Sequence, residues 1–117
     1  MRSRETALKL KRFEMAEKAR KAADLERMIG ELECMAADLD RQIEAEEELA
    51  GVKDPQDLAY STFAKSAILR RDNLRASIAE LHVNLKAALR ERDEAREQLN
   101  SRPEQQQNRN DERPVQD

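Results

Sequence analysis

The side chains that most often do chemistry in proteins are sparse and dispersed in this sequence. His82 is its only histidine and Cys34 its only cysteine. A metal site needs several His, Cys, Asp or Glu side chains that converge on one point, and none converges on either residue. Cys34 also lacks a basic neighbour that would activate its thiol. We therefore expect both side chains to face solvent without a chemical role.

The remaining candidate for ion binding is the run from Glu46 to Glu48. Carboxylates bind divalent cations, but these three lack the spacing of a calcium-binding loop. The chain also has no glycine-rich phosphate loop, nucleophile elbow or dinucleotide fingerprint. The sequence therefore predicts a protein that is not an enzyme and has no cofactor, metal or small-molecule substrate.

Two stripes of apolar residues run through the chain. Within each stripe the apolar residues follow one another at alternating steps of three and four. In a helix of ~3.6 residues per turn, this spacing places them on one narrow line along the helix. Such a line needs a matching one on a second helix. The sequence therefore predicts an all-α fold, with two long helices in an antiparallel coiled-coil hairpin. The first stripe is Ala22, Leu25, Ile29, Leu32, Ala36, Leu39 and Ile43, and the second is Ala67, Leu74, Ile78, Leu81, Leu85 and Ala88, interrupted by Arg71.

Gly51 and the dipeptide Asp54-Pro55 mark the connection between the two helices. Glycine closes a helix C-terminus in the left-handed conformation, and proline fits the first turn of a new helix. We expect a helical turn over 55–60 and a cap at Ser61 or Thr62, with an uninterrupted helix from Pro55 as the alternative. The predicted segments are a helix over about 3–50, a bend over 51–60 and a helix over about 61–100, which form one hairpin over 1–100, and a disordered tail over 101–117.

Folding back at this bend pairs residues at equal sequence distances from Pro55. Ile43 then meets Ala67, and Ile29 meets Leu81. Farther from the bend the stripes are thinly filled, and Lys18 faces Arg92 across the seam, so we expect that half to be less stable. Arg71 and Arg92 lie on the seam itself. Each either extends its charge to solvent or marks a place where a partner replaces the other helix.

Charged residues make up 40% of the chain and aromatic residues 3%, and the charges are distributed unevenly along it. Residues 1–21 hold eight Lys or Arg against three Glu, whereas residues 24–57 hold twelve Asp or Glu against three basic residues. In a hairpin one end would be basic and the other acidic. This arrangement suits docking between two partners, or it simply reflects two solvated faces.

No apolar run approaches the ~20 residues that span a bilayer, and no signal peptide is expected. The single thiol fits a reducing cytoplasm.

Several apolar side chains fall outside the stripes. Leu10 and Phe13 lie in the basic segment without an obvious partner inside the hairpin. A second group crowds near the bend, and it either anchors a binding partner or caps the open end of the coiled coil. This second group is Leu58, Tyr60, Phe63, Ile68 and Leu69.

Four stretches of this sequence resemble the FliJ family, the small stalk protein of the bacterial flagellar type III export apparatus, in its alphaproteobacterial form. They are Arg4 to Phe13, Asp54-Pro55, Ala59 to Lys65 and Arg70 to Leu74. The resemblance extends over roughly residues 2–100. It implies an antiparallel two-helix coiled coil similar to the shaft of rotary ATPases.

The resemblance also implies partners and a location. The partners are the flagellar export ATPase hexamer, the export gate protein and export chaperones, at the cytoplasmic face of the inner membrane, with membrane association only through those partners. The basic end, with Leu8, Leu10, Lys11, Arg12 and Phe13, is assigned to the ATPase. The bend, with Leu58, Tyr60, Phe63, Ile68 and Arg71, is assigned to the gate and chaperones.

Two other functions are compatible with the sequence. A generic coiled-coil scaffold or homodimeric adaptor would pair the same stripes between chains instead of within one. Nucleic-acid binding through the basic N-terminal segment is opposed by the overall net charge of −3 and by the lack of interleaved aromatic residues.

Overall fold

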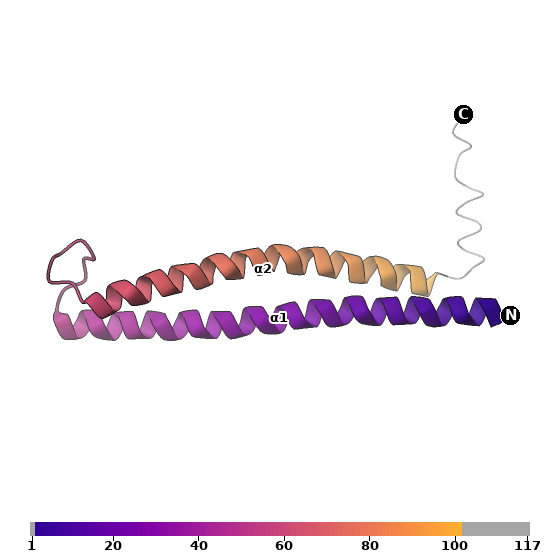
Figure 1. The fold of residues 1–117 in the computed structure, drawn as a ribbon, viewed down its shortest axis with the longest axis horizontal. Helices are drawn as coiled ribbons and strands as arrows, with labels where there is room; N and C mark the ends of the chain where they lie inside the picture. Colours follow the sequence, from indigo (N-terminus) through magenta and orange to yellow (C-terminus); the bar gives the residue numbers. More distant parts are fainter. Residues whose placement is uncertain (1, 102–117) are drawn as a thin grey trace, which may run out of the picture. The chain divides into compact units, whose positions relative to one another are not determined.

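The structure is a computed structural model and describes residues 2–101. Two α-helices make up most of this part of the chain. Helix α1 spans Arg2–Ala50 and helix α2 spans Thr62–Asn100, with a loop between them (Figure 1). No strand occurs within residues 2–101. The predicted all-α hairpin of two long helices is thus confirmed. The predicted tail over 101–117 lies outside the described residues, apart from Ser101.

The helices contribute to two units. Among the described residues, the terminal unit contains 2–23 and 86–101, and the bend unit consists of Asp24–Leu85. In each unit a segment of α1 pairs with a segment of α2. That residues 1–100 form one hairpin domain, as the sequence predicts, stays a prediction.

The bend unit has a core of small and branched side chains. Leu39, Ile43 and Ala67 form a buried cluster, and Ile68 and Leu74 pack against it. Ile43 and Ala67 are the pair predicted from equal distances to Pro55, so the register is confirmed at this point. The other buried apolar residues of this unit are Ile29, Ala36, Tyr60 and Ala64.

The loop replaces the expected helical turn with two successive tight turns. The amide of Asp57 donates to the carbonyl of Asp54 at 3.0 Å, and the amide of Tyr60 donates to the carbonyl of Asp57 at 3.1 Å. Each aspartate carboxylate also accepts a bond from the amide two residues later, at 2.9 Å. Such local bonds favour turns over helix. The alternative of a helix from Pro55 is therefore wrong.

The flanking helix ends are closed as the sequence predicted. Gly51 has a φ of 71°, and its amide donates to the carbonyl of Glu47 at 2.9 Å. The Ser61 hydroxyl accepts a bond from the amide of Ala64 at 3.1 Å. Ser61 is thus the N-cap of α2.

The terminal unit has a much smaller core, because Ala22 and Ala88 are its only fully buried apolar residues within the described chain. Lys18 and Arg92, predicted to face each other across the seam, are both half-buried, and each pairs with a carboxylate. Lys18 forms an ion pair with Glu91 at 3.3 Å, and Arg92 pairs with its neighbour Asp93 at 2.9 Å. Long flexible side chains carry their charges out of the seam to carboxylates at its edge.

Candidate protein-binding surfaces

The first candidate surface lies on α1 in the terminal unit. Leu10 and Phe13 are three residues apart, so they share one side of the helix, and they are 56% and 62% exposed. Leu8 is also exposed, as is Arg12, whereas Lys11 is half-buried at the seam. We call these five residues the basic surface. They are the residues predicted for the ATPase end, and the structure keeps both large apolar side chains free of the core.

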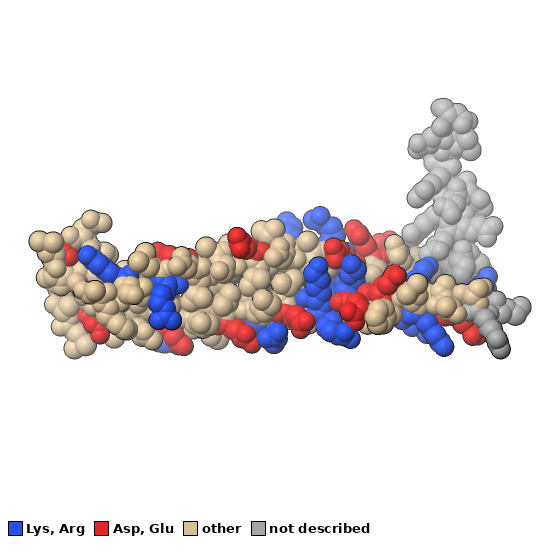
Figure 2. Space-filling model, viewed as in Figure 1, with Lys and Arg blue, Asp and Glu red and all other residues tan. Residues whose placement is uncertain are grey.

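The cations of this surface lack a carboxylate partner in the part of the chain that the structure describes. Within residues 2–101, no carboxylate pairs with Lys11, Arg12 or the nearby Lys9. The described part of the terminal unit holds twelve Lys or Arg against seven Asp or Glu, whereas the bend unit holds seven against fourteen. On the face shown in Figure 2 the two kinds of charge are interleaved along the helices. The excess of positive charge is therefore spread over the terminal unit as a whole. The basic surface combines this charge with the exposed apolar side chains of Leu10 and Phe13.

Tyr60 is not the exposed anchor that the sequence suggested. It is only 5% exposed, and its hydroxyl donates to Glu47 Oε2 at 2.7 Å. This bond to a carboxylate, together with burial, raises the pKa of Tyr60 to about 12. Beside it the Ser61 hydroxyl donates to Glu46 Oε2 at 3.2 Å. Tyr60 therefore closes the end of the coiled coil, which is the second of the two roles considered for it.

Two more of the predicted bend residues serve the fold. Ile68 is half-buried against the core cluster of the bend unit. Arg71 has a side chain that is 21% exposed, and it donates to Asp40 at 3.0 Å and to Asp72 at 3.2 Å. These bonds raise the pKa of Arg71. The guanidinium of Arg71 therefore extends out of the seam to carboxylates on the solvent-facing side of the helices. This is one of the two roles that the sequence left open for Arg71.

The exposed apolar side chains near the bend are fewer than predicted, and one was missed. Leu58 is fully exposed, Leu69 is 66% exposed and Phe63 is 55% exposed, so these three residues of the predicted group remain available to a partner. Leu49, at the end of α1, is 82% exposed and was not singled out from the sequence. Much of the surface over the loop is uncharged in Figure 2. We call Leu49, Leu58 and Phe63 the bend surface.

A separate set of apolar residues lies on α2. Leu69 is 66% exposed and Val83 is 70% exposed. Together with Ala76 they are spaced by seven residues, which keeps them on one side of the helix. Val83 was not singled out from the sequence, and its seven-residue relation to Leu69 is the signal of an outward position.

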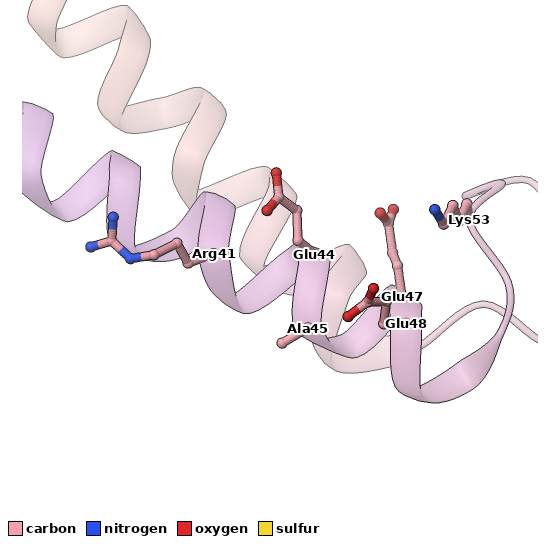
Figure 3. Close-up of a pocket in the computed structure, with 6 residues that line it drawn as sticks. All are labelled: Arg41, Glu44, Ala45, Glu47, Glu48 and Lys53. Carbon is pink, nitrogen blue, oxygen red and sulfur yellow. The ribbon is translucent and has the colours of Figure 1, made fainter.

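Glu47 and Glu48 of the acidic run, together with Glu44, line an open hollow at the end of α1 with a volume of about 490 Å³. The carboxylates of Glu44, Glu47 and Glu48 project from the last turns of the helix, with Arg41 on one side and Lys53 of the loop on the other (Figure 3). Within the described residues, no group of three or more His, Cys, Asp or Glu side chains is arranged to hold a metal ion. Glu47 is already bonded to Tyr60. The hollow is thus a solvated acidic surface.

The two lone reactive residues lie where the sequence placed them. Cys34 and His82 are both exposed.

In neither described helix is there a stretch apolar enough to cross a bilayer. Comparisons with protein-family models, with curated proteins and with solved structures give no match for this chain.

Proposed function

We propose that this chain is a non-enzymatic stalk component of the flagellar type III protein export apparatus, of the FliJ kind. Two features support the proposal: the four sequence stretches that resemble the family, and the antiparallel pairing of two long helices. In this role the protein acts at the cytoplasmic face of the inner membrane. It binds the export ATPase hexamer, the export gate and export chaperones.

The observation that carries the proposal is the basic surface. Phe13 is 62% exposed on a helix whose nearest cations have no carboxylate partner within residues 2–101. An exposed aromatic ring beside unpaired cations is costly to leave in water and is typical of a binding hot spot. The terminal unit therefore inserts into the ATPase, and attraction to acidic groups of the ring guides it there.

The bend surface is the proposed contact with the gate and chaperones. Leu58 and Phe63 remain from the five residues assigned to this end, and Leu49 joins them. The surrounding unit is acidic, so it selects partners with basic or neutral surfaces. Tyr60, Ile68 and Arg71 support this surface from within the fold.

The test measures binding of the full chain to a purified flagellar export ATPase and the resulting ATP turnover. Phe13→Asp places a charge in the proposed contact and is expected to weaken binding about tenfold or more, with loss of any stimulation. Val83→Asp is the matched control, because it makes the same kind of change on an equally exposed apolar residue of α2. Equal binding by the two variants would refute this placement of the ATPase contact.

A second candidate function is that of a homodimeric coiled-coil scaffold. The exposed Leu69 and Val83 on one side of α2 favour it, because an uncovered apolar line invites a second helix. Sedimentation of the full chain separates the two functions. A stable dimer that Val83→Asp dissociates, without ATPase binding by the wild type, would favour the scaffold.

A further inference from the structure

The charges that form no ion pair differ in sign between the two units. Within residues 2–101, most cations without a carboxylate partner belong to the terminal unit, and most carboxylates without a cation belong to the bend unit. The cations of the terminal unit in this state are Arg4, Lys9, Lys11, Arg12, Lys21, Lys86, Arg90 and Arg96. The carboxylates of the bend unit in this state are Asp24, Glu26, Glu33, Glu44, Glu46, Glu47, Glu48, Asp54, Asp57 and Glu80. Each unit therefore leaves uncompensated the charge that complements the other.

The basic surface combines such cations with exposed apolar side chains. Leu10 lies between Lys9 and Lys11 in sequence, and Phe13 directly follows Arg12. The side chains of Leu10 and Phe13 are 56% and 62% exposed. A surface of this kind is best covered by a partner that supplies both apolar contact and carboxylates.

The bend surface has the complementary composition. Leu49 directly follows Glu48 at the end of α1, and Leu58 directly follows Asp57 in the loop. Leu49 is 82% exposed, Leu58 is fully exposed and Phe63 is 55% exposed. Among the described residues, Glu48 has no cationic partner, and Asp57 accepts a hydrogen bond only from a backbone amide. Exposed apolar side chains thus lie beside uncompensated negative charge.

Other carboxylates near the bend surface also keep their charge. Glu46 accepts a hydrogen bond from the hydroxyl of Ser61 at 3.2 Å, and Glu47 accepts one from the hydroxyl of Tyr60 at 2.7 Å. A neutral donor leaves the net charge of a carboxylate in place. Lys53 borders the acidic hollow but forms no ion pair within residues 2–101 (Figure 3). The negative charge around the bend therefore remains available to an external cation.

Neither surface is suited to pairing with the same surface of a second copy. Two basic surfaces would bring unpaired cations together, and two bend surfaces would bring unpaired carboxylates together. Such like-charge contacts are costly. A contact between one basic surface and one bend surface joins opposite charges and covers apolar side chains of both. Because every copy carries both surfaces, each copy always meets its complement at the concentration of the chain itself.

We propose that the basic surface of one copy binds the bend surface of a second copy. Phe13 of the first copy contacts Leu49 and Leu58 of the second. Arg12 and Lys9 of the first copy pair with the carboxylates beside those leucines. The contact is heterologous, since it joins two different surfaces. The inference does not depend on the export role. In that role, copies joined in this way would have to separate before either surface binds another protein.

The first test is sedimentation velocity of the full chain over a range of concentrations. The wild type should associate, and the association should weaken as salt is raised from about 0.05 to 0.5 M, because exposed charges are screened. Phe13→Asp and Leu58→Arg each place a repelling charge in the contact and should weaken association about tenfold or more. Circular dichroism establishes that each variant is folded.

Matched controls make the same changes on exposed apolar residues of α2 outside both surfaces. They are Val83→Asp and Leu69→Arg, at positions that are 70% and 66% exposed. Both should associate like the wild type. If these controls abolish association while Phe13→Asp does not, the copies pair through α2 and the proposal is overturned.

The second test mixes the two surface variants. Phe13→Asp keeps an intact bend surface and Leu58→Arg keeps an intact basic surface, so the two should bind each other although neither binds itself. Cys34 is the only cysteine, is exposed and lies outside both surfaces, so it can carry a fluorescent label. Fluorescence anisotropy of labelled Phe13→Asp should therefore rise on addition of Leu58→Arg, with a Kd within about tenfold of the wild-type value, and stay constant on addition of unlabelled Phe13→Asp.

Two results would refute the heterologous contact. One is a mixture of the two variants that does not bind although the wild type associates. The other is a wild-type chain that stays monomeric up to about 1 mM at low salt. Because the tests contain only this chain, both results would leave binding to an export ATPase to be decided by its own measurement.

Discussion

At the scale of single residues, Tyr60 provides a direct probe of the bend. It is the only tyrosine, and the chain has no tryptophan. Because Glu47 raises its pKa to about 12, above the unfolded value of about 10, the hydroxyl bond favours the folded state below pH 10. That advantage is lost as the pH rises from 10 to about 12. Ultraviolet titration should show a midpoint near 12 in the folded chain.

The control for this titration is Glu47→Gln, which keeps a hydrogen-bond acceptor but removes the charge. Its midpoint should move down toward 10, because an amide opposes ionisation of the phenol less than a carboxylate does. A wild-type midpoint near 10 under folding conditions would show that Tyr60 is not bonded to Glu47.

Substitution of Arg71 tests how much a charged residue at the seam contributes to the free energy of unfolding. Its ion pair with Asp40 is partly exposed and therefore weak, and Arg75 would continue to neutralise Asp40 without it. Arg71→Leu should raise the free energy of unfolding by about 1 kcal/mol, because an apolar side chain then fills the seam beside Leu74. The midpoint of urea unfolding measures the change. A loss of stability would mean that the ion pair outweighs the packing.

At the scale of elements, the two glycines should respond in opposite directions to alanine. Gly30 lies inside α1 with no atom within 4 Å of an added Cβ, so Gly30→Ala should stabilise the chain by about 1 kcal/mol. Gly51 has a φ of 71°, which strains any residue with a Cβ. Gly51→Ala should therefore destabilise the chain by about 1 kcal/mol. Thermal unfolding followed by circular dichroism checks both signs.

The start of α2 depends on the Ser61 cap. Ser61→Ala removes the acceptor for the amide of Ala64 and should cost about 1 kcal/mol. Ser66→Ala, at an exposed position inside the same helix, should instead be neutral or slightly stabilising. If the two variants unfold at the same urea concentration, the cap does not define the start of the helix.

At the scale of the whole molecule, the two units should differ in local stability. The terminal unit buries only Ala22 and Ala88 completely among its described residues, whereas the bend unit has a branched core around Leu39 and Ile43. Amides over 5–18 of α1 should therefore exchange hydrogen about tenfold or more faster than amides over 30–43. Uniform protection along α1 would contradict this expectation. An unstable terminal unit suits insertion into another protein, because the partner then supplies the missing contacts.

Much of the helix pairing could be read from the sequence. From Ala22 to Ile43, every residue of the predicted first stripe is buried or half-buried on α1, and the same holds for the second stripe on α2 from Ala67 to Ala88. The stripe was readable because helical periodicity depends only on local spacing. The exposure of Leu10 and Phe13 followed from the same periodicity, since both fall off the stripe.

The binding surfaces near the bend were predicted less well. Tyr60 and Ile68 were grouped with Phe63 because all three are apolar and close in sequence. The loop then carries Tyr60 back against Glu47, 13 residues earlier, and buries it. That path depends on two successive turns held by Asp54 and Asp57, whose combined direction no periodicity describes.

By itself the sequence determined where the helices lie, how their seams align and which segments carry excess charge, since each of these depends on local spacing or on residue type. Only the tertiary structure decided which ionised groups find partners. Lys18 was assigned opposite Arg92 but binds Glu91, and Asp40 binds Arg71 and Arg75 while Arg70 receives no carboxylate from residues 2–101. The reason is that long side chains reach across helices to whichever counterion is nearest in space.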